Sequence, residues 1–150
     1  MNERKIKVCA DLRQWIFSKR DLWRQASEAA AACDSIKDQW YLEGVKGIYD
    51  VFDMMIDNFE EDPAQVDPIA FIGQIINHSS GRILSMRLER DKAESLQNKE
   101  GVKREGMICA WNEILNFTRE MRRSFNEEYL KKKEAEKNDL KQRQEEKTSC

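Results

Sequence analysis

The segment Glu60-Glu61-Asp62-Pro63-Ala64-Gln65-Val66-Asp67-Pro68 decides the fold, because it holds both prolines of this 150-residue chain. Proline inside a helix costs about 3 kcal/mol, since it lacks a backbone N–H and clashes with the preceding turn. Long helices can therefore run before Pro63 and after Pro68 without interruption by proline. The segment predicts a bend between two helical halves that fold back on each other.

Two local signals indicate where helices begin. Asp67 followed by Pro68 is a start signal, with an acidic N-cap and a proline at the first helical position. Asp34 and Ser35 are both good N-cap residues, and Asp38 lies three positions past Ser35, as in a capping box. These residues predict a second break in the chain near position 34.

Apolar side chains at alternating spacings of three and four residues predict helices that each bury one seam. The seams are Val8, Leu12, Trp15, Leu22, Ala26, Ala29 and Cys33; Leu42, Val45, Tyr49, Phe52, Ile56 and Phe59; Ile69, Ile72, Ile76, Ile83 and Met86; and Met107, Trp111, Ile114, Met121 and Phe125. We predict an all-α fold, an antiparallel bundle of three to four long helices or two αα-hairpins, held by coiled-coil-like seams.

The C-terminal part of the chain lacks such a seam. Residues 131–149 contain Ala135 and Leu140 and are otherwise polar. A segment without an apolar face has nothing to bury, so it is a solvated helical extension or a frayed tail. We therefore predict a bundle domain over residues 1–130 and a charged extension over 131–150, helical at its start and mobile at its end.

Short internal matches suggest duplication. Glu43-Gly44-Val45-Lys46 recurs as Glu100-Gly101-Val102-Lys103, and a Gly-x-x-x-apolar-aromatic-Asp/Asn pattern begins at both Gly47 and Gly106. The offsets between the matches drift, so chance and true duplication both stay open. If the duplication is real, each half is one αα-hairpin.

Composition excludes several classes of protein. The net charge is only −2, with −5 in residues 1–75 and +3 in residues 76–150, an asymmetry that suits a homodimer or a partner protein better than nucleic acid. The four cysteines form no Cys-x-x-Cys pair, and a single histidine cannot complete a zinc site with them. No secretory leader and no apolar run of about 18 residues is present. We expect a cytoplasmic protein without a membrane span.

An acidic row is the most chemically suggestive feature. Asp50, Asp53, Asp57 and Glu60 follow one side of a predicted helix, and paired carboxylates bind Mg²⁺. All-α nucleotide pyrophosphohydrolases use a Glu-Glu-x-x-Glu helix with a Glu-x-x-Asp partner, and neither element is intact in this chain. We interpret the row first as a solvated face. A metal-dependent hydrolase and an acidic face for a partner are the alternatives.

Catalytic chemistry has no other support in the sequence. His78 and Ser79 adjoin the third seam, but no signature of a nucleophile, base and orienting acid surrounds them. We expect no enzyme, and no catalytic, cofactor-binding or metal-binding residue.

Basic residues and one tryptophan complete the candidate contacts. Arg119, Arg122 and Arg123 precede three consecutive lysines, but glutamates alternate with them, which favours pairing within the helix over a nucleic-acid surface. Trp40 lies outside the seams, as a plug at a hairpin end or a partner contact. The candidate partner-binding residues are Trp40, Asp50, Asp53, Asp57, Arg119, Arg122 and Arg123.

The stretch Gly106-Met-Ile-Cys-Ala-Trp-Asn-Glu-Ile-Leu115 is similar to helices in short accessory proteins of bacteriophages and mobile elements, over about ten residues. That resemblance implies a small inhibitor or modulator of a host protein. Together with the seams, we predict a non-enzymatic helical protein-binding module that self-associates, most simply as a dimer. The alternatives are a metal-dependent all-α hydrolase and a nucleic-acid-binding helical protein.

Overall fold

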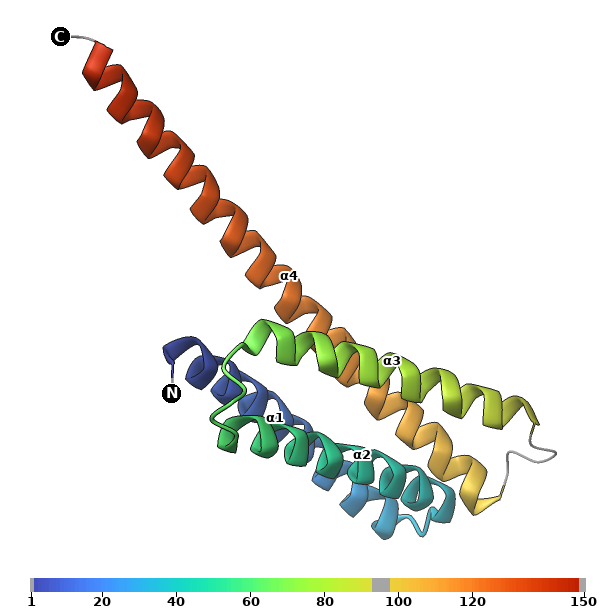
Figure 1. The fold of residues 1–150 in the computed structure, drawn as a ribbon. Coiled ribbons are helices and arrows are strands. Elements are labelled where there is room, and N and C mark those ends of the chain that lie inside the picture. The colour runs from blue at the N-terminus through green and yellow to red at the C-terminus, as the bar shows by residue number, and fades with distance from the viewer. Residues whose placement is uncertain (1, 93–97, 149–150) are drawn as a thin grey trace.

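The computed structural model describes residues 2–92 and 98–148, which form four helices and contain no strand (Figure 1). The helices are α1 (Glu3–Ala32), α2 (Ile36–Glu61), α3 (Pro68–Lys92) and α4 (Lys99–Thr148). The all-α prediction is confirmed, with breaks near residue 34 and between Glu61 and Pro68.

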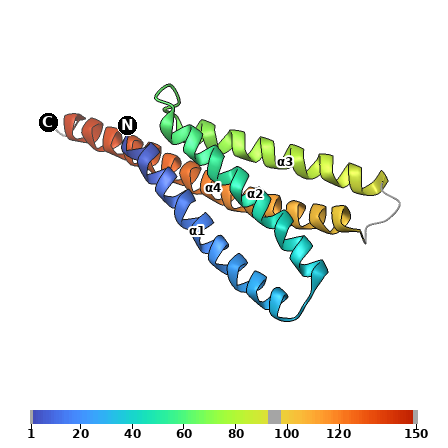
Figure 2. The ribbon, with the colours of Figure 1, turned by 90° about the horizontal axis from the view of Figure 1, so that it is seen from below.

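The four helices form two hairpins that meet through α2 and α4. α1 packs on α2, and α3 packs on α4. α2 and α4 contact each other and run in the same direction, because Gly44 lies against Lys103 and Tyr49 bonds to Glu113 further along both helices. Figure 2 shows the hairpin of α1 and α2 leaving α4 at an angle toward its connecting loop.

The core lies where the two hairpins cross. The largest fully buried apolar side chains come from all four helices and are Val8, Leu12, Phe52, Ile56, Phe59, Ile72, Ile75, Trp111 and Ile114. Removing one large apolar side chain from water contributes about 1.5–3 kcal/mol. The seams predicted for the second, third and fourth helices therefore contribute to one shared core, except that Ile69 of the third seam is 37% exposed.

The predicted seam of α1 is right only in its first half. Val8 and Leu12 are buried, whereas Leu22 is 58% exposed and Cys33 is also exposed. A strict 3,4 repeat advances by 3.5 residues per turn, so it drifts around a helix of 3.6 residues per turn by about 20° every seven residues. Beyond residue 20 the inward face has therefore moved to Trp23 and Ala30.

The α1–α2 and α2–α3 turns are each set by a polar residue. At the end of α1, Asp34 takes a left-handed conformation with φ of 51°. The N–H groups of Asp34 and Ser35 then donate to the carbonyls of Ala31 and Ala30, which closes a Schellman motif. At the start of α3, the Asp67 carboxylate accepts from the next free backbone N–H groups, as its N-cap position predicts.

A buried lysine ties α1 to the proline-containing bend, which the sequence did not indicate. Lys5 is 3% exposed. Its Nζ donates to the carbonyl oxygens of Asp62 and Gln65 at 2.9 and 2.5 Å and lies 4.5 Å from the centroid of the Phe59 ring. Lys5 therefore caps the C-terminal end of α2 with its charge and holds the bend against the first turn of α1.

The last part of α4 projects beyond the bundle (Figure 1). Residues 131–147 are exposed, and the helix is continuous across the predicted boundary at residue 130. Glu127 and Lys131 are four residues apart, a spacing that stabilises an isolated helix by about 0.2–0.5 kcal/mol per pair. The extension is thus a charged helical rod through Thr148.

Candidate partner-binding surface

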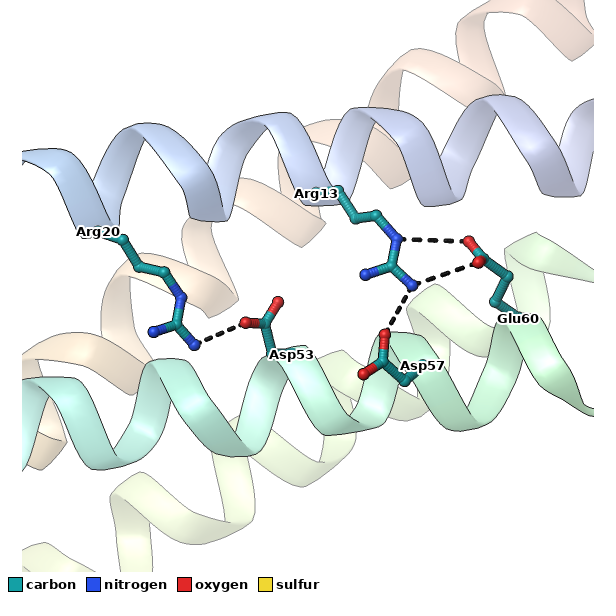
Figure 3. Close-up of polar contacts among 5 residues, drawn as sticks. All are labelled: Arg13, Arg20, Asp53, Asp57 and Glu60. Atoms are coloured by element: carbon teal, nitrogen blue, oxygen red, sulfur yellow. Dashed lines mark hydrogen bonds and ion pairs between the residues drawn. The ribbon is translucent and has the colours of Figure 1, made fainter.

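The acidic row predicted from the sequence lines the seam between α1 and α2 (Figure 3). Arg13 Nη2 lies 2.7 Å from Asp57 Oδ1 and 3.4 Å from Glu60 Oε1. Two helical turns further along α1, Arg20 Nη2 lies 2.8 Å from Asp50 Oδ1 and 2.6 Å from Asp53 Oδ2. Arg13 and Arg20 of α1 therefore each bridge two carboxylates of α2.

The acidic row is partly exposed, as expected of a solvated face, and it is also paired with α1. The side chains of Asp50, Asp53 and Asp57 are 52%, 34% and 50% exposed, yet each has an arginine partner on α1. Ion pairs this exposed contribute about 0–1 kcal/mol each and chiefly fix how α1 and α2 align. The acidic row therefore forms ion pairs within the chain, between α2 and α1.

The alternative of a metal site gains no support from this geometry. The described residues contain no group of three or more histidine, cysteine or acidic side chains placed to hold a metal ion. The candidate carboxylates instead face guanidinium groups, which occupy the position that a cation would take.

The predicted basic residues lie elsewhere on the molecule. Arg119, Arg122 and Arg123 are exposed on α4, and Arg123 pairs with Glu120 on its own helix. Trp40 is half-buried in the second turn of α2. The structure therefore does not bring the seven predicted residues together into one site.

The residues considered for catalysis, His78 and Ser79, are adjacent on α3 but differ in exposure. His78 is exposed and its ring lies edge-on to Trp111, with centroids 5.1 Å apart. Ser79 is fully buried, and its hydroxyl has no hydrogen-bond partner in the described residues. Burial, reinforced by Glu60, raises the pKa of the Cys9 thiol and disfavours the reactive thiolate.

A polar cluster joins three helices where the sequence showed only an interrupted seam. Glu113 of α4 accepts a hydrogen bond from Tyr49 of α2 at 2.8 Å and lies 3.5 Å from Lys19 Nζ of α1. Burial raises the pKa of Tyr49, and its hydrogen bond to the Glu113 carboxylate raises it further. Lys19, the polar residue at the seam position between Trp15 and Leu22, thus pairs with a residue that the sequence did not single out.

A groove between α1 and α4 is the surface that sequence reasoning missed. Trp15 and Phe117 stack toward one end of the groove, with ring centroids 4.7 Å apart and an interplanar angle of 10°. Met121 and Phe125 continue the apolar lining, and all four side chains are half-buried. Trp15, Met121 and Phe125 belong to predicted seams, which led us to expect them in the core. Their partial exposure depends on the distance between α1 and α4, which the spacing of apolar residues does not reveal.

The rim of the groove is polar and predominantly acidic. Its other lining residues are Lys7, Asp11, Gln14, Ser18, Glu120, Ser124 and Glu128. The volume is about 490 Å³, within the range of about 300–1,000 Å³ usual for ligand pockets. An apolar floor between charged edges is a composition that binding grooves commonly have.

Comparisons with known proteins give no indication of the function. No family model matches the chain, and neither a curated protein nor a solved structure shows significant similarity to it. Among the described residues, no helix combines the length and the apolar character that crossing a membrane requires.

Proposed function

We propose that this chain is a non-enzymatic helical module that binds another protein. The observation that carries the proposal is the α1–α4 groove, where the neighbouring side chains of Trp15, Phe117, Met121 and Phe125 are all half-buried. Aromatic residues and methionine in a partly covered groove are the side chains that most often anchor protein contacts.

The charged extension supports the same class of function. Residues 131–147 continue from the groove-lining part of α4 as an exposed helix. At a rise of about 1.5 Å per residue, those 17 residues extend roughly 25 Å from the bundle. A partner in the groove would lie at the base of this rod.

Self-association stays a prediction. The seams that suggested it are mostly covered within one chain, so no second copy is needed to bury them. The role of inhibitor or modulator, implied by the resemblance of residues 106–115 to helices of phage accessory proteins, likewise stays a prediction.

The test compares two single substitutions on α4. Ser124 lines the groove and is exposed, whereas Asn126 is exposed and does not line it. Ser124→Arg should fill the groove, and Asn126→Arg adds the same side chain outside it. Both are surface changes expected to alter stability by less than about 0.5 kcal/mol.

Affinity capture from cells that produce the protein, followed by mass spectrometry, is the measurement. We expect a partner that wild type and Asn126→Arg retain and Ser124→Arg loses. Light scattering on the purified chain reports self-association in parallel. A chain that captures no protein and stays monomeric at micromolar concentration would contradict the proposal.

A further inference from the structure

We infer that the α1–α4 groove accepts an amphipathic helix of a partner protein that carries lysine or arginine beside its apolar residues. The inference rests on the proposed function and adds the chemistry of the partner. It follows from the spacing of the groove residues, the character of the floor and the charge of the rim.

The spacing fits a helix as the occupant. The α1 wall runs from Lys7 to Ser18 and the α4 wall from Phe117 to Glu128, twelve residues on each. The two walls are antiparallel helices, since Trp15 contacts Phe117 and Lys19 contacts Glu113. From its first to its last residue each wall rises about 17 Å, which matches three turns of a third helix lying between them.

The floor suits large apolar side chains that repeat along one helix face. The stacked rings of Trp15 and Phe117 present a flat apolar surface, and Met121 adapts to irregular shapes. A helix lying in such a groove inserts residues at positions i, i+3 or i+4, and i+7. The occupant therefore needs an apolar stripe about three turns long.

The rim specifies the charge of that helix. Asp11, Glu120 and Glu128 oppose a single cation, Lys7, so the rim carries a net charge of −2. Glu120 already pairs with Arg123, whereas Asp11 and Glu128 have no ion-pair partner among the described residues. Two free carboxylates on opposite walls favour basic side chains that flank the apolar stripe on both sides.

The experiment uses a displayed library of 18-residue amphipathic helical peptides selected on the full chain. The apolar stripe is drawn from leucine, phenylalanine and methionine, and the flanking positions are randomised among lysine, glutamate, glutamine and serine. We expect enrichment of lysine at the flanks. The selected peptides should bind more weakly as salt concentration rises, because the rim pairs are exposed.

A pair of neighbouring glutamates supplies the matched control. Glu128 lines the groove and Glu127 does not, although both are exposed on the same turn of α4. Glu128→Lys should weaken the selected peptides by about fivefold or more, the scale of losing one exposed ion pair and gaining a repulsion. Glu127→Lys should change their affinity by less than about twofold.

Three results would overturn the inference. These are flanks enriched in glutamate, no peptide selected above background, and equal loss of affinity in both lysine variants. A dimer that Ser124→Arg dissociates would name a second copy as the occupant, which refutes the basic partner helix and leaves the proposed function intact. The proposed function itself would be refuted if the chain bound no peptide, captured no protein and did not self-associate.

Discussion

Gly44 of α2 and Gly106 of α4 pack each against the backbone of the other helix in the same way. A Cβ atom at Gly44 would lie 2.1 Å from the Lys103 carbonyl oxygen, and one at Gly106 would lie 2.0 Å from the Tyr41 carbonyl oxygen. In each case the carbonyl belongs to the residue three positions before the opposite glycine. The two helices thus meet through a locally two-fold contact in which any side chain would separate them.

Gly44→Ala should therefore destabilise the protein. The added methyl group meets backbone rather than a movable side chain, so the helices must shift apart, at a cost of about 1–3 kcal/mol or more. Gly47 has open space around its Cβ position, and Gly47→Ala should be neutral or stabilise by up to about 1 kcal/mol. Urea unfolding monitored by circular dichroism measures both. Equal effects of the two substitutions would refute the close approach.

The free energy of unfolding should fall as the pH rises above about 10. The ordinary pKa of tyrosine is 10.0, and burial with the Glu113 hydrogen bond raises that of Tyr49. Between the two values the folded state holds a proton that the unfolded state has released. Stability is therefore full below pH 10 and declines by up to about 1.4 kcal/mol per pH unit for each such group.

Tyr49→Phe isolates this contribution. The substitution removes one hydrogen bond, which costs about 1 kcal/mol near neutral pH, and it should make the alkaline decline shallower. Tyr41 has a pKa raised by burial and by Cys109, so part of the slope should persist in the variant. Denaturant unfolding at pH 8 to 11 gives both slopes. Identical slopes for wild type and Tyr49→Phe would count against a perturbed Tyr49.

Adding Mg²⁺ or Mn²⁺ should leave the melting temperature unchanged. The acidic row is already bridged by Arg13 and Arg20, and Asp53→Asn should cost at most about 1 kcal/mol, less at high salt. Thermal melts of wild type and Asp53→Asn with and without metal decide the matter. Stabilisation by metal that Asp53→Asn removes would revive the hydrolase alternative.

Asp34→Gly should stabilise the protein by up to about 1 kcal/mol. Asp34 has a positive φ of 51°, a conformation that glycine adopts without a Cβ penalty. Asp34→Val should have the opposite effect and destabilise the protein, because β-branched residues disfavour the left-handed region of backbone conformation. Thermal unfolding of the three proteins should rank glycine above aspartate and aspartate above valine. Valine equal to glycine would contradict the left-handed turn.

A chain ending at Leu130 should melt like the full chain. Residues 131–147 are exposed along α4 and bury no apolar seam, so their removal costs little folding energy. The loss of helical signal should match the missing residues. A drop in melting temperature of more than a few degrees would show that the extension packs on the bundle, against the predicted division at residue 130.

The positions of the two described turns could be predicted from the sequence because the signals are local. Asp67 and Pro68 fix the start of α3 through one carboxylate and one missing N–H group, and both act within a single turn. Most of the apolar faces of the last three helices followed from spacing for the same reason. The seam of α1 failed beyond residue 20, because a strict repeat of three and four residues drifts around a long helix of 3.6 residues per turn.

The candidate binding groove between α1 and α4 could not be predicted from local sequence signals. Trp15 and Phe117 are 102 positions apart in the chain, and their contact depends on the relative placement of α1 and α4. Likewise, the carboxylates Asp50 and Asp57 were visible as a row, but their partners Arg20 and Arg13 lie on another helix.

The sequence by itself determined that this chain is helical, where it turns, and which side of most helices is apolar, because those properties depend on interactions within a few residues. Only the tertiary structure decided which glycines touch, which charges pair and which aromatic side chains remain half-covered. Those outcomes depend on the register and crossing of whole helices, and the mutual approach of Gly44 and Gly106 sets both for α2 and α4.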